Sequence, residues 1–142
     1  AMLLSQIMKN KKAIILNPAY TLLFQSKGIL KVLWELYPNH PLLLETSDKP
    51  LANKKCVRKP VFGREGANVA IIEASGETSL ETQGAYGNEK MIYQEFVEFN
   101  EHKDECYQAG VFFAYEGCGL GFRKGGLVLD NFAKFVGHII KE

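Results

Sequence analysis

The sequence CVRKPVFGREGANVAII at residues 56–72 predicts two short strands joined by a loop. Pro60 ends the first strand, because proline cannot donate to a β-ladder and holds the preceding Lys59 in an extended conformation. The apolar run at residues 69–72 is typical of a buried second strand. Two glycines in the loop, Gly63 and Gly66, permit positive φ and a close approach of the backbone to a ligand.

The basic residues of this stretch have two interpretations. A lysine at a strand end, loop amides and the guanidinium of Arg64 together suit a polyphosphate, because they offer a point charge, donors and a planar fork. The alternative is an ordinary β-hairpin whose basic residues are solvated. The spacing matches neither the GxxxxGK[ST] nor the GxGxxG phosphate loop, so the pattern alone leaves both interpretations open.

The remaining patterns predict an α+β fold of mostly antiparallel sheet with few helices. Ser26 is a candidate N-cap for a helix from Lys27 to Leu36, and residues 45–55 are polar enough for a surface loop. Other predicted elements are a helix at 2–10 and strands at 13–16, 91–96, 106–114 and 117–122. The predicted buried helix face is Ile29, Leu30, Leu33, Trp34 and Tyr37.

Length and composition indicate one globular domain over residues 1–142, with 46% apolar and 23% charged residues. A net charge of +1 gives no reason to expect nucleic acid or an anionic membrane surface as a partner. No apolar run approaches the length of a membrane span. Three cysteines, an odd number, fit reduced thiols in a cytoplasmic protein better than a disulfide framework.

Residues 56–72 also resemble the signature of the glutathionylspermidine synthase family, in which a KP…GREG-N loop of this length occurs with the same lysine and arginine. Six further blocks match in the same order, at residues 17–20, 26–27, 33–40, 91–94, 121–123 and 135–138. The resemblance implies an ATP-grasp-like fold, with residues 1–142 as a C-terminal fragment of the synthetase domain. It implies the ATP-binding part of an ATP-dependent carboxylate–amine ligase that works through an acyl phosphate.

The same resemblance assigns roles in nucleotide binding. Lys27 and Lys59 match lysines that bind ATP phosphates, and Gly63 and Gly66 lie in the loop beside them. Lys27 has a structural alternative as a solvated lysine, although the helix macrodipole does not favour a cation in a first turn unless an anion is near. Tyr93 and Gln94 lie in a segment similar to the one that lines the adenine pocket of ATP-grasp proteins; from pattern alone, this segment is a half-buried strand.

The resemblance also assigns roles in phosphoryl transfer and substrate binding to two arginines. Arg64 matches the loop arginine that reaches over the active site, where it would stabilise a transferring phosphoryl group and contact substrate. Arg123 matches an arginine implicated in binding glutathione, and its structural alternative is an exposed charge at a strand end. The implied partners are therefore a nucleotide, a glutathione-like peptide and a polyamine.

One departure from the family limits the expected activity. The family's magnesium ligands and most of its glutathione-binding residues lie upstream of everything that matches here, and neither Glu65 nor Glu73 matches a metal ligand. We therefore expect ATP with Mg²⁺ whose protein ligands lie outside this chain, and a lone chain that is incomplete. A partner chain with the upstream half, or a homo-oligomer, would complete it. The alternative function is a non-catalytic binding or oligomeric remnant of such a ligase.

Overall fold

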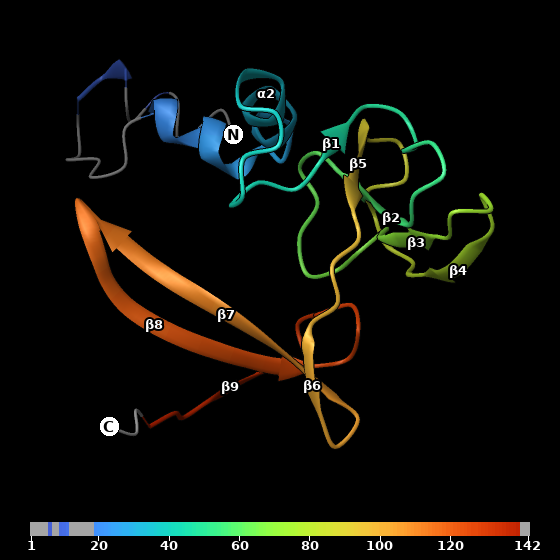
Figure 1. Ribbon diagram of the computed structural model, residues 1–142. Helices are drawn as coiled ribbons and strands as arrows, with labels where there is room; N and C mark the ends of the chain where they lie inside the picture. The colour runs from blue at the N-terminus through green and yellow to red at the C-terminus, as the bar shows by residue number, and fades with distance from the viewer. Residues whose placement is uncertain (1–5, 7–8, 12–18, 140–142) are drawn as a thin grey trace.

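The computed structural model describes residues 6, 9–11 and 19–139, and it consists mainly of antiparallel sheet (Figure 1). The helical elements with both ends in this part are the 3₁₀ helix η1 (Ala19–Gln25) and the α-helix α2 (Gly28–Leu36), and Gln6 and Lys9 are also helical. The strands are β1 (Thr46–Ser47), β2 (Cys56–Pro60), β3 (Ala70–Ile72), β4 (Thr78–Glu81), β5 (Met91–Glu95), β6 (Asn100–His102), β7 (Glu105–Ala114), β8 (Glu116–Gly125) and β9 (Lys134–Val136). The predicted α+β class is confirmed.

The first sheet has the strand order β1-β5-β2-β3-β4 and is built around the predicted pair β2 and β3. The two strands are antiparallel, with Val57 opposite Ile71. Alternate side chains of β2 and β5 point to opposite faces of the sheet. Both faces contribute to the core, since Cys56, Ala70, Ile71 and Ile92 are each at most 3% exposed. This core holds the end of β2 and its loop in place.

The second sheet has the strand order β6-β7-β8-β9 and is dominated by the long β7–β8 hairpin. Strand β6 pairs only with residues 105–107 of β7, and β9 pairs only with residues 122–124 of β8. Beyond those residues the hairpin extends away from the first sheet (Figure 1), and its large side chains Val111, Phe112, Phe113 and Tyr115 are all at least 60% exposed.

The predicted helix exists, but its cap and its buried face differ from the prediction. Lys27 is the N-cap by position and makes no side-chain cap, whereas the Ser26 hydroxyl accepts a 3.3 Å hydrogen bond from the Gly28 amide. No residue of α2 is buried: four members of the predicted face are half-buried, and Tyr37 is 57% exposed. Little of the described chain packs on this face.

The predicted surface loop at residues 45–55 is in part a structural element. Thr46 and Ser47 form β1, which pairs with β5, and Thr46 and Leu51 are buried. The polar composition of the segment does not predict this strand, because hydrogen bonds rather than apolar contacts account for the burial of Thr46. Most of the helix predicted at 2–10 and the whole strand predicted at 13–16 lie outside the described residues. In the described part, no helix has the length and apolar character needed to cross a membrane.

Candidate functional site

The Lys59 side chain is fixed at the end of β2 by a polar chain across three strands. Lys59 lies opposite Ile92 and Val57 lies opposite Gln94, so alternation puts Lys59 and Gln94 on the same face of the sheet. The Lys59 ammonium donates a 2.6 Å hydrogen bond to Gln94 Oε1, and Gln94 Nε2 donates to Thr46 Oγ1 at 3.1 Å. Because Pro60 is fully buried, the strand end itself is anchored.

Lys27 reaches the same place from the start of α2. Its amide donates to the Val61 carbonyl at 2.9 Å, and its ammonium donates to the Gly63 carbonyl. The helix therefore begins where the loop after β2 begins. This contact brings together two lysines that are 32 positions apart in the chain (27 and 59).

The loop between β2 and β3 is held in an unusual backbone conformation. Glu65, Gly66 and Asn68 all have positive φ, between 55° and 68°. The hydroxyl of Thr82 donates to the Gly66 carbonyl at 2.6 Å and accepts from the Val69 amide at 2.9 Å. Asn68 Oδ1 accepts from the amide of Tyr86 at 2.8 Å, so both halves of the loop are tied to the segment after β4.

Gly66 also marks the contact between the loop and the second sheet. A Cβ at this position would lie 2.9 Å from the Leu129 carbonyl oxygen and 2.9 Å from Val128 Cγ1. The backbones can approach this closely only because Gly66 has no side chain. The segment at 127–130, between β8 and β9, thereby forms the far wall of the site.

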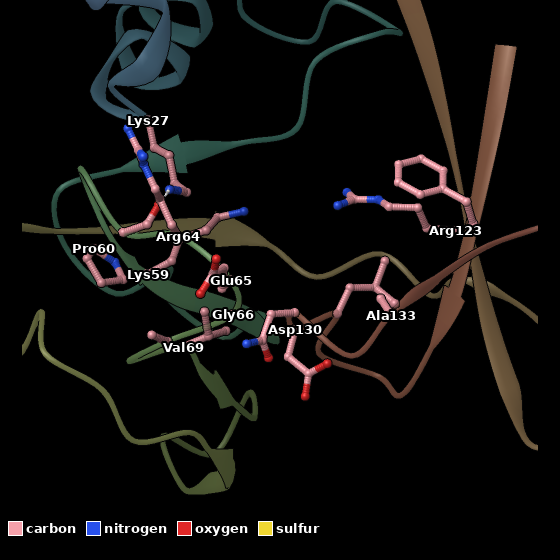
Figure 2. A pocket seen from close by; sticks show the side chains of 15 residues that line it. Lys27, Lys59, Pro60, Arg64, Glu65, Gly66, Val69, Arg123, Asp130 and Ala133 are labelled. Carbon is pink, nitrogen blue, oxygen red and sulfur yellow. Dashed lines mark hydrogen bonds between the residues drawn. The ribbon is translucent and has the colours of Figure 1, made fainter.

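Two arginines enter the site from opposite sides. Arg64, in the loop, donates a 3.2 Å hydrogen bond to Gln25 Oε1 at the end of η1. Arg123, on β8, donates to Gln108 Oε1 on the neighbouring strand β7. Figure 2 shows the Arg123 side chain pointing from β8 toward the side that carries Lys27 and Arg64.

These residues enclose a cavity of about 480 Å³, which we call the cationic cavity. Four basic side chains and two acidic ones line it: Lys27, Lys59, Arg64, Arg123, Glu65 and Asp130. In the part of the chain that the structure describes, none of the four basic groups forms an ion pair, whereas other lysines do, such as Lys55 with Glu73 at 3.0 Å. The cavity therefore has an excess of positive charge, which suits a polyanion.

Burial and neighbouring positive charges disfavour the protonated, charged form of both lysines. Burial, and then the positive charge of Lys27, lower the pKa of Lys59 from 10.5 to about 8. Burial and the charge of Arg64 also lower the pKa of Lys27. Bringing a phosphate between these groups would reverse the unfavourable charge–charge interactions, because an opposite charge favours the protonated amine.

A second cavity of about 270 Å³ adjoins the first, and most of the residues that line it are apolar. It shares six lining residues with the cationic cavity: Lys27, Lys59, Gly66, Val69, Arg123 and Leu129. The rest of its wall includes Val57, Ile71, Phe96 and Phe99, and we call it the apolar cavity. A charged end next to an apolar end is the arrangement that binds a molecule with a polar head and a flat apolar body.

The structure brings together most of the residues that the sequence singled out. Lys27, Lys59, Gly63, Gly66, Arg64 and Arg123 line the cationic cavity. Gln94 lies behind Lys59, where both ends of its amide are already hydrogen-bonded. Tyr93 is not brought to either cavity, because it lies opposite Arg58 in the sheet and alternation turns it to the other face.

Several lining residues were not predicted. Asp130 and Leu129 follow β8 and match no pattern in the sequence. Gln25, which lies outside the lining of the cavity, was also missed, although it accepts the hydrogen bond that orients Arg64. In the described residues, no group of three or more His, Cys, Asp or Glu side chains lies close enough together to hold a metal ion. Glu65 and Asp130 are the two carboxylates among the described residues that line the cavity. They do not make an all-protein cage, although Mg²⁺ at a phosphate site commonly takes only one or two carboxylates beside the phosphates.

Comparison with known proteins gives a consistent set of relatives. The profile of the family described as "Glutathionylspermidine synthase preATP-grasp" matches residues 1–141. A putative acid–amine ligase of Haemophilus influenzae is 32% identical over 134 residues, which cover 87% of this chain and 34% of the relative. The chain is also 34% identical over 96 residues to trypanothione synthetase of Crithidia fasciculata, covering 66% of the chain and 14% of the relative.

A third relative is the bifunctional glutathionylspermidine synthetase/amidase of Escherichia coli, which is 30% identical over 95 residues, covering 65% of the chain and 15% of the relative. All three names denote ligases or synthetases. The chain spans about a third of the length of the first relative and less of the other two.

Proposed function

Because the chain belongs to the glutathionylspermidine synthase preATP-grasp family, as its sequence predicted, we propose that its cationic cavity binds the polyphosphate of ATP. The observation that carries this proposal is the convergence of Lys27, Lys59, Arg64 and Arg123 on one cavity without a carboxylate partner in the described part of the chain. The implied activity is that of an ATP-dependent ligase that joins a carboxylate to an amine.

The loop and the two lysines have complementary tasks in this proposal. Lys27 and Lys59 supply point charges for the phosphate oxygens, and the amides between Gly63 and Gly66 supply neutral donors. Within the described residues, each lysine ammonium has one hydrogen bond, to Gly63 or to Gln94, and further donors that could bind a ligand. Arg64 supplies a planar fork that suits charge spread over a transferring phosphoryl group.

The nucleotide base is best placed in the apolar cavity. Phe96 and Phe99 offer aromatic surface there, and the cavity shares Lys59 with the cationic cavity. Gln94 acts through Lys59 in this arrangement, since its amide is already hydrogen-bonded at both ends. Tyr93 lies on the opposite face of the sheet from Gln94, so its ring does not contact the base in this proposal. Phe96, which follows β5, contributes aromatic surface to the cavity instead.

The reaction of such a ligase proceeds in two transfers. A substrate carboxylate oxygen attacks the γ-phosphorus of ATP, the bond to the β-phosphate oxygen breaks, and an acyl phosphate and ADP form. The amine nitrogen then attacks the acyl carbon, which forms the amide and releases phosphate and a proton. Arg64 and Arg123 would hold the charge that develops in the first transfer.

We propose that the substrates and partners of this chain are of the kinds that the names of its relatives indicate. Glutathione-like peptides and polyamines are the candidates that the relatives' names suggest. We propose that residues 1–142 form the C-terminal part of the synthetase domain and that Mg²⁺, carried by ATP, takes its protein ligands from a segment or partner chain beyond it. The free thiols of Cys56, Cys106 and Cys118 support a reducing compartment, the cytoplasm.

The test is calorimetric titration with ATP and with inorganic tripolyphosphate. Wild-type protein should bind both, and Lys59→Met should bind each about 10- to 100-fold more weakly, because a charged hydrogen bond is lost. Lys49→Met is the matched control, since it removes the same charge from an exposed position outside the cavity and should leave both affinities unchanged. Failure of wild-type protein to bind either ligand would exclude the proposal.

The exposed hairpin favours a second candidate, a non-catalytic role in assembly. Val111, Phe113 and Tyr115 are 70%, 75% and 102% exposed, and exposed apolar surface of this kind is typical of interfaces. Light scattering coupled to size exclusion tests it. A dimer that binds no ATP would favour the assembly role, and a monomer that binds ATP would favour the ligase.

A further inference from the structure

The side-chain nitrogen of Lys59 is held by the protein on one side and faces the two cavities on the other. The side chain is half-buried and lines both the cationic cavity and the apolar cavity. The nitrogen donates a 2.6 Å hydrogen bond to Gln94 Oε1, and Gln94 is itself held by Thr46. A neutral amine also has an N–H group for this hydrogen bond. The position of the nitrogen is therefore defined whether or not the lysine is charged.

The surroundings of this nitrogen favour the neutral amine when no anion is bound. Burial of Lys59, and then the positive charge of Lys27, lower the pKa of Lys59 to about 8. The other charged groups that line the cationic cavity are Arg64, Arg123, Glu65 and Asp130. In the described residues, neither of these carboxylates forms an ion pair with Lys59. Near pH 8, about half of the protein without a bound anion therefore has a neutral amine at the cavity wall.

A neutral lysine in this position is a nucleophile. Gln94 uses one N–H group, so the other N–H group and the lone pair are available to a molecule in the cavity. Desolvation and a neighbouring cation are two conditions that activate lysine as a nucleophile. Lys27 and Arg64 line the same cavity, and their charges suit a phosphate group. The cavity therefore suits a molecule in which a phosphate is joined to an electrophilic carbon.

We propose that Lys59 is a site of covalent acylation by small acyl phosphates when no nucleotide is bound. The neutral amine attacks the acyl carbon and forms a C–N bond. The bond from that carbon to the bridging oxygen breaks, inorganic phosphate leaves with the electron pair, and the nitrogen releases a proton to water. Lys27 and Arg64 hold the phosphate of the reagent and stabilise the charge of the leaving group. This inference rests on the proposed function, because the same groups hold the reagent and the phosphates of ATP.

Acylation of Lys59 and binding of ATP exclude each other. The amide that forms on Lys59 has no positive charge and offers no ammonium to the phosphate oxygens. A bound polyphosphate has the opposite effect, because its negative charge favours the protonated lysine, which is not nucleophilic. Acylation therefore switches off the site in protein that lacks nucleotide and spares protein that has bound it.

The test follows acetylation of the wild-type chain by acetyl phosphate at pH 8, without nucleotide, by peptide mass spectrometry over time. Lys49 is exposed and lies outside both cavities, so it is the reference lysine in the same sample. We expect Lys59 to be acetylated at least about tenfold faster than Lys49, because much of its amine is neutral at this pH and the cavity holds the reagent. Saturating ATP or tripolyphosphate should remove this preference and leave the rate at Lys49 unchanged.

A second reagent and two variants test the role of the phosphate. The N-hydroxysuccinimide ester of acetic acid transfers the same acetyl group without a phosphate, so its preference for Lys59 over Lys49 should be smaller. Arg64→Gln removes a phosphate partner and should lower the preference of acetyl phosphate about tenfold, with no change for the ester. Lys90→Gln is the control, since it removes a charge from an exposed position outside both cavities and should change neither preference.

The effect of acetylation on ATP binding is measured by calorimetry before and after treatment with acetyl phosphate. Treated wild type should bind ATP about 10- to 100-fold more weakly than untreated wild type, because a charged hydrogen bond is lost. Lys59→Arg keeps a positive charge but has no amine that can be acylated, so treatment should leave the affinity of this variant at its own starting value. An equal loss in treated Lys59→Arg would place the reactive lysine elsewhere and contradict the inference.

Equal acetylation of Lys59 and Lys49 by acetyl phosphate would overturn the inference, and so would an equal preference of both reagents for Lys59. The ATP titration of untreated protein distinguishes this failure from failure of the ATP site. If ATP binds and acetyl phosphate does not prefer Lys59, the acylation inference alone is wrong. If acetyl phosphate prefers Lys59 and ATP neither binds nor slows the reaction, the acylation site stands and the nucleotide proposal is wrong.

Discussion

The ammonium of Lys59 and the side-chain amide of Gln94 form a 2.6 Å hydrogen bond that joins β2 to β5 on the face turned toward the site. Gln94 is 9% exposed, and its Nε2 group continues the chain to Thr46 Oγ1 at 3.1 Å. The amide orientation is thereby defined, because its oxygen must accept from lysine while its nitrogen donates to threonine. Gln94 thus fixes the position of the Lys59 ammonium.

We predict that Gln94→Met lowers the free energy of unfolding by about 1–3 kcal/mol, because Lys59 and Thr46 lose a buried partner together. Urea denaturation at pH 7 measures this. Gln83→Met makes the same change at an exposed position and should shift the unfolding midpoint little. Equal shifts in the two variants would mean that the polar chain contributes nothing to stability.

The lowered pKa of Lys59 predicts a rise in stability between about pH 8 and pH 10.5. In this range the folded protein has lost the Lys59 proton and the unfolded chain still holds it, so unfolding takes up a proton and becomes harder as pH rises. The gain is at most about 3 kcal/mol. The lowered pKa of Lys27 acts in the same direction.

The measurement is the free energy of unfolding of wild type and Lys59→Met at pH 7.5, 9 and 10. The difference between the two proteins removes the contributions of other groups that titrate in this range. Wild type should gain on the variant as pH rises. A constant difference would show that Lys59 has the same pKa in the folded and unfolded states.

ATP affinity should fall as pH rises above about 8, because the proposed complex needs the protonated form of Lys59. Each pH unit above the pKa of the free protein lowers the affinity by up to about tenfold. Titration calorimetry at pH 7, 8 and 9 tests this. Lys59→Met should bind weakly, with a shallower dependence of affinity on pH. Parallel pH profiles in the two proteins would show that Lys59 does not bind the phosphates.

Local patterns predicted the two strands and the connecting loop around which the candidate site is built. Pro60 and the apolar run at 69–72 define the two strands, and a single contiguous loop places Gly63, Arg64 and Gly66 beside Lys59. These features depend on backbone preferences that act over a few residues. The family resemblance, rather than any local pattern, pointed to Lys27 and Arg123, which are distant in sequence.

Features that depend on strand register or on packing partners were not predictable. The sequence does not show that Lys59 lies opposite Ile92, and without this register Tyr93 and Gln94 are equally good candidates for the site. The helical spacing of Leu30 and Trp34 puts them on one face, where both are half-buried, but it does not reveal what covers that face. Thr46 was missed because hydrogen bonds, rather than apolar character, account for its burial.

The close approach of Gly66 to Leu129 gives the sharpest prediction about the wall of the site. Gly66→Ala places a Cβ 2.9 Å from a backbone oxygen at a residue with φ of +68°, so both strain and a steric clash result. We expect a loss of about 2–4 kcal/mol in unfolding free energy. Gly76→Ala is the matched control: its φ is +89°, but no atom lies within 4 Å of the added Cβ.

Gly76→Ala should therefore lose only about 1 kcal/mol of unfolding free energy, because it causes backbone strain but no steric clash. Urea denaturation of both variants gives the two values, and ATP titration adds an independent readout. Gly66→Ala should also weaken ATP binding, because the loop must move away from the 127–130 segment and carries Arg64 with it, whereas Gly76→Ala should bind as wild type does. If the two variants lose the same stability and keep the same affinity, the contact between Gly66 and Leu129 does not shape the site.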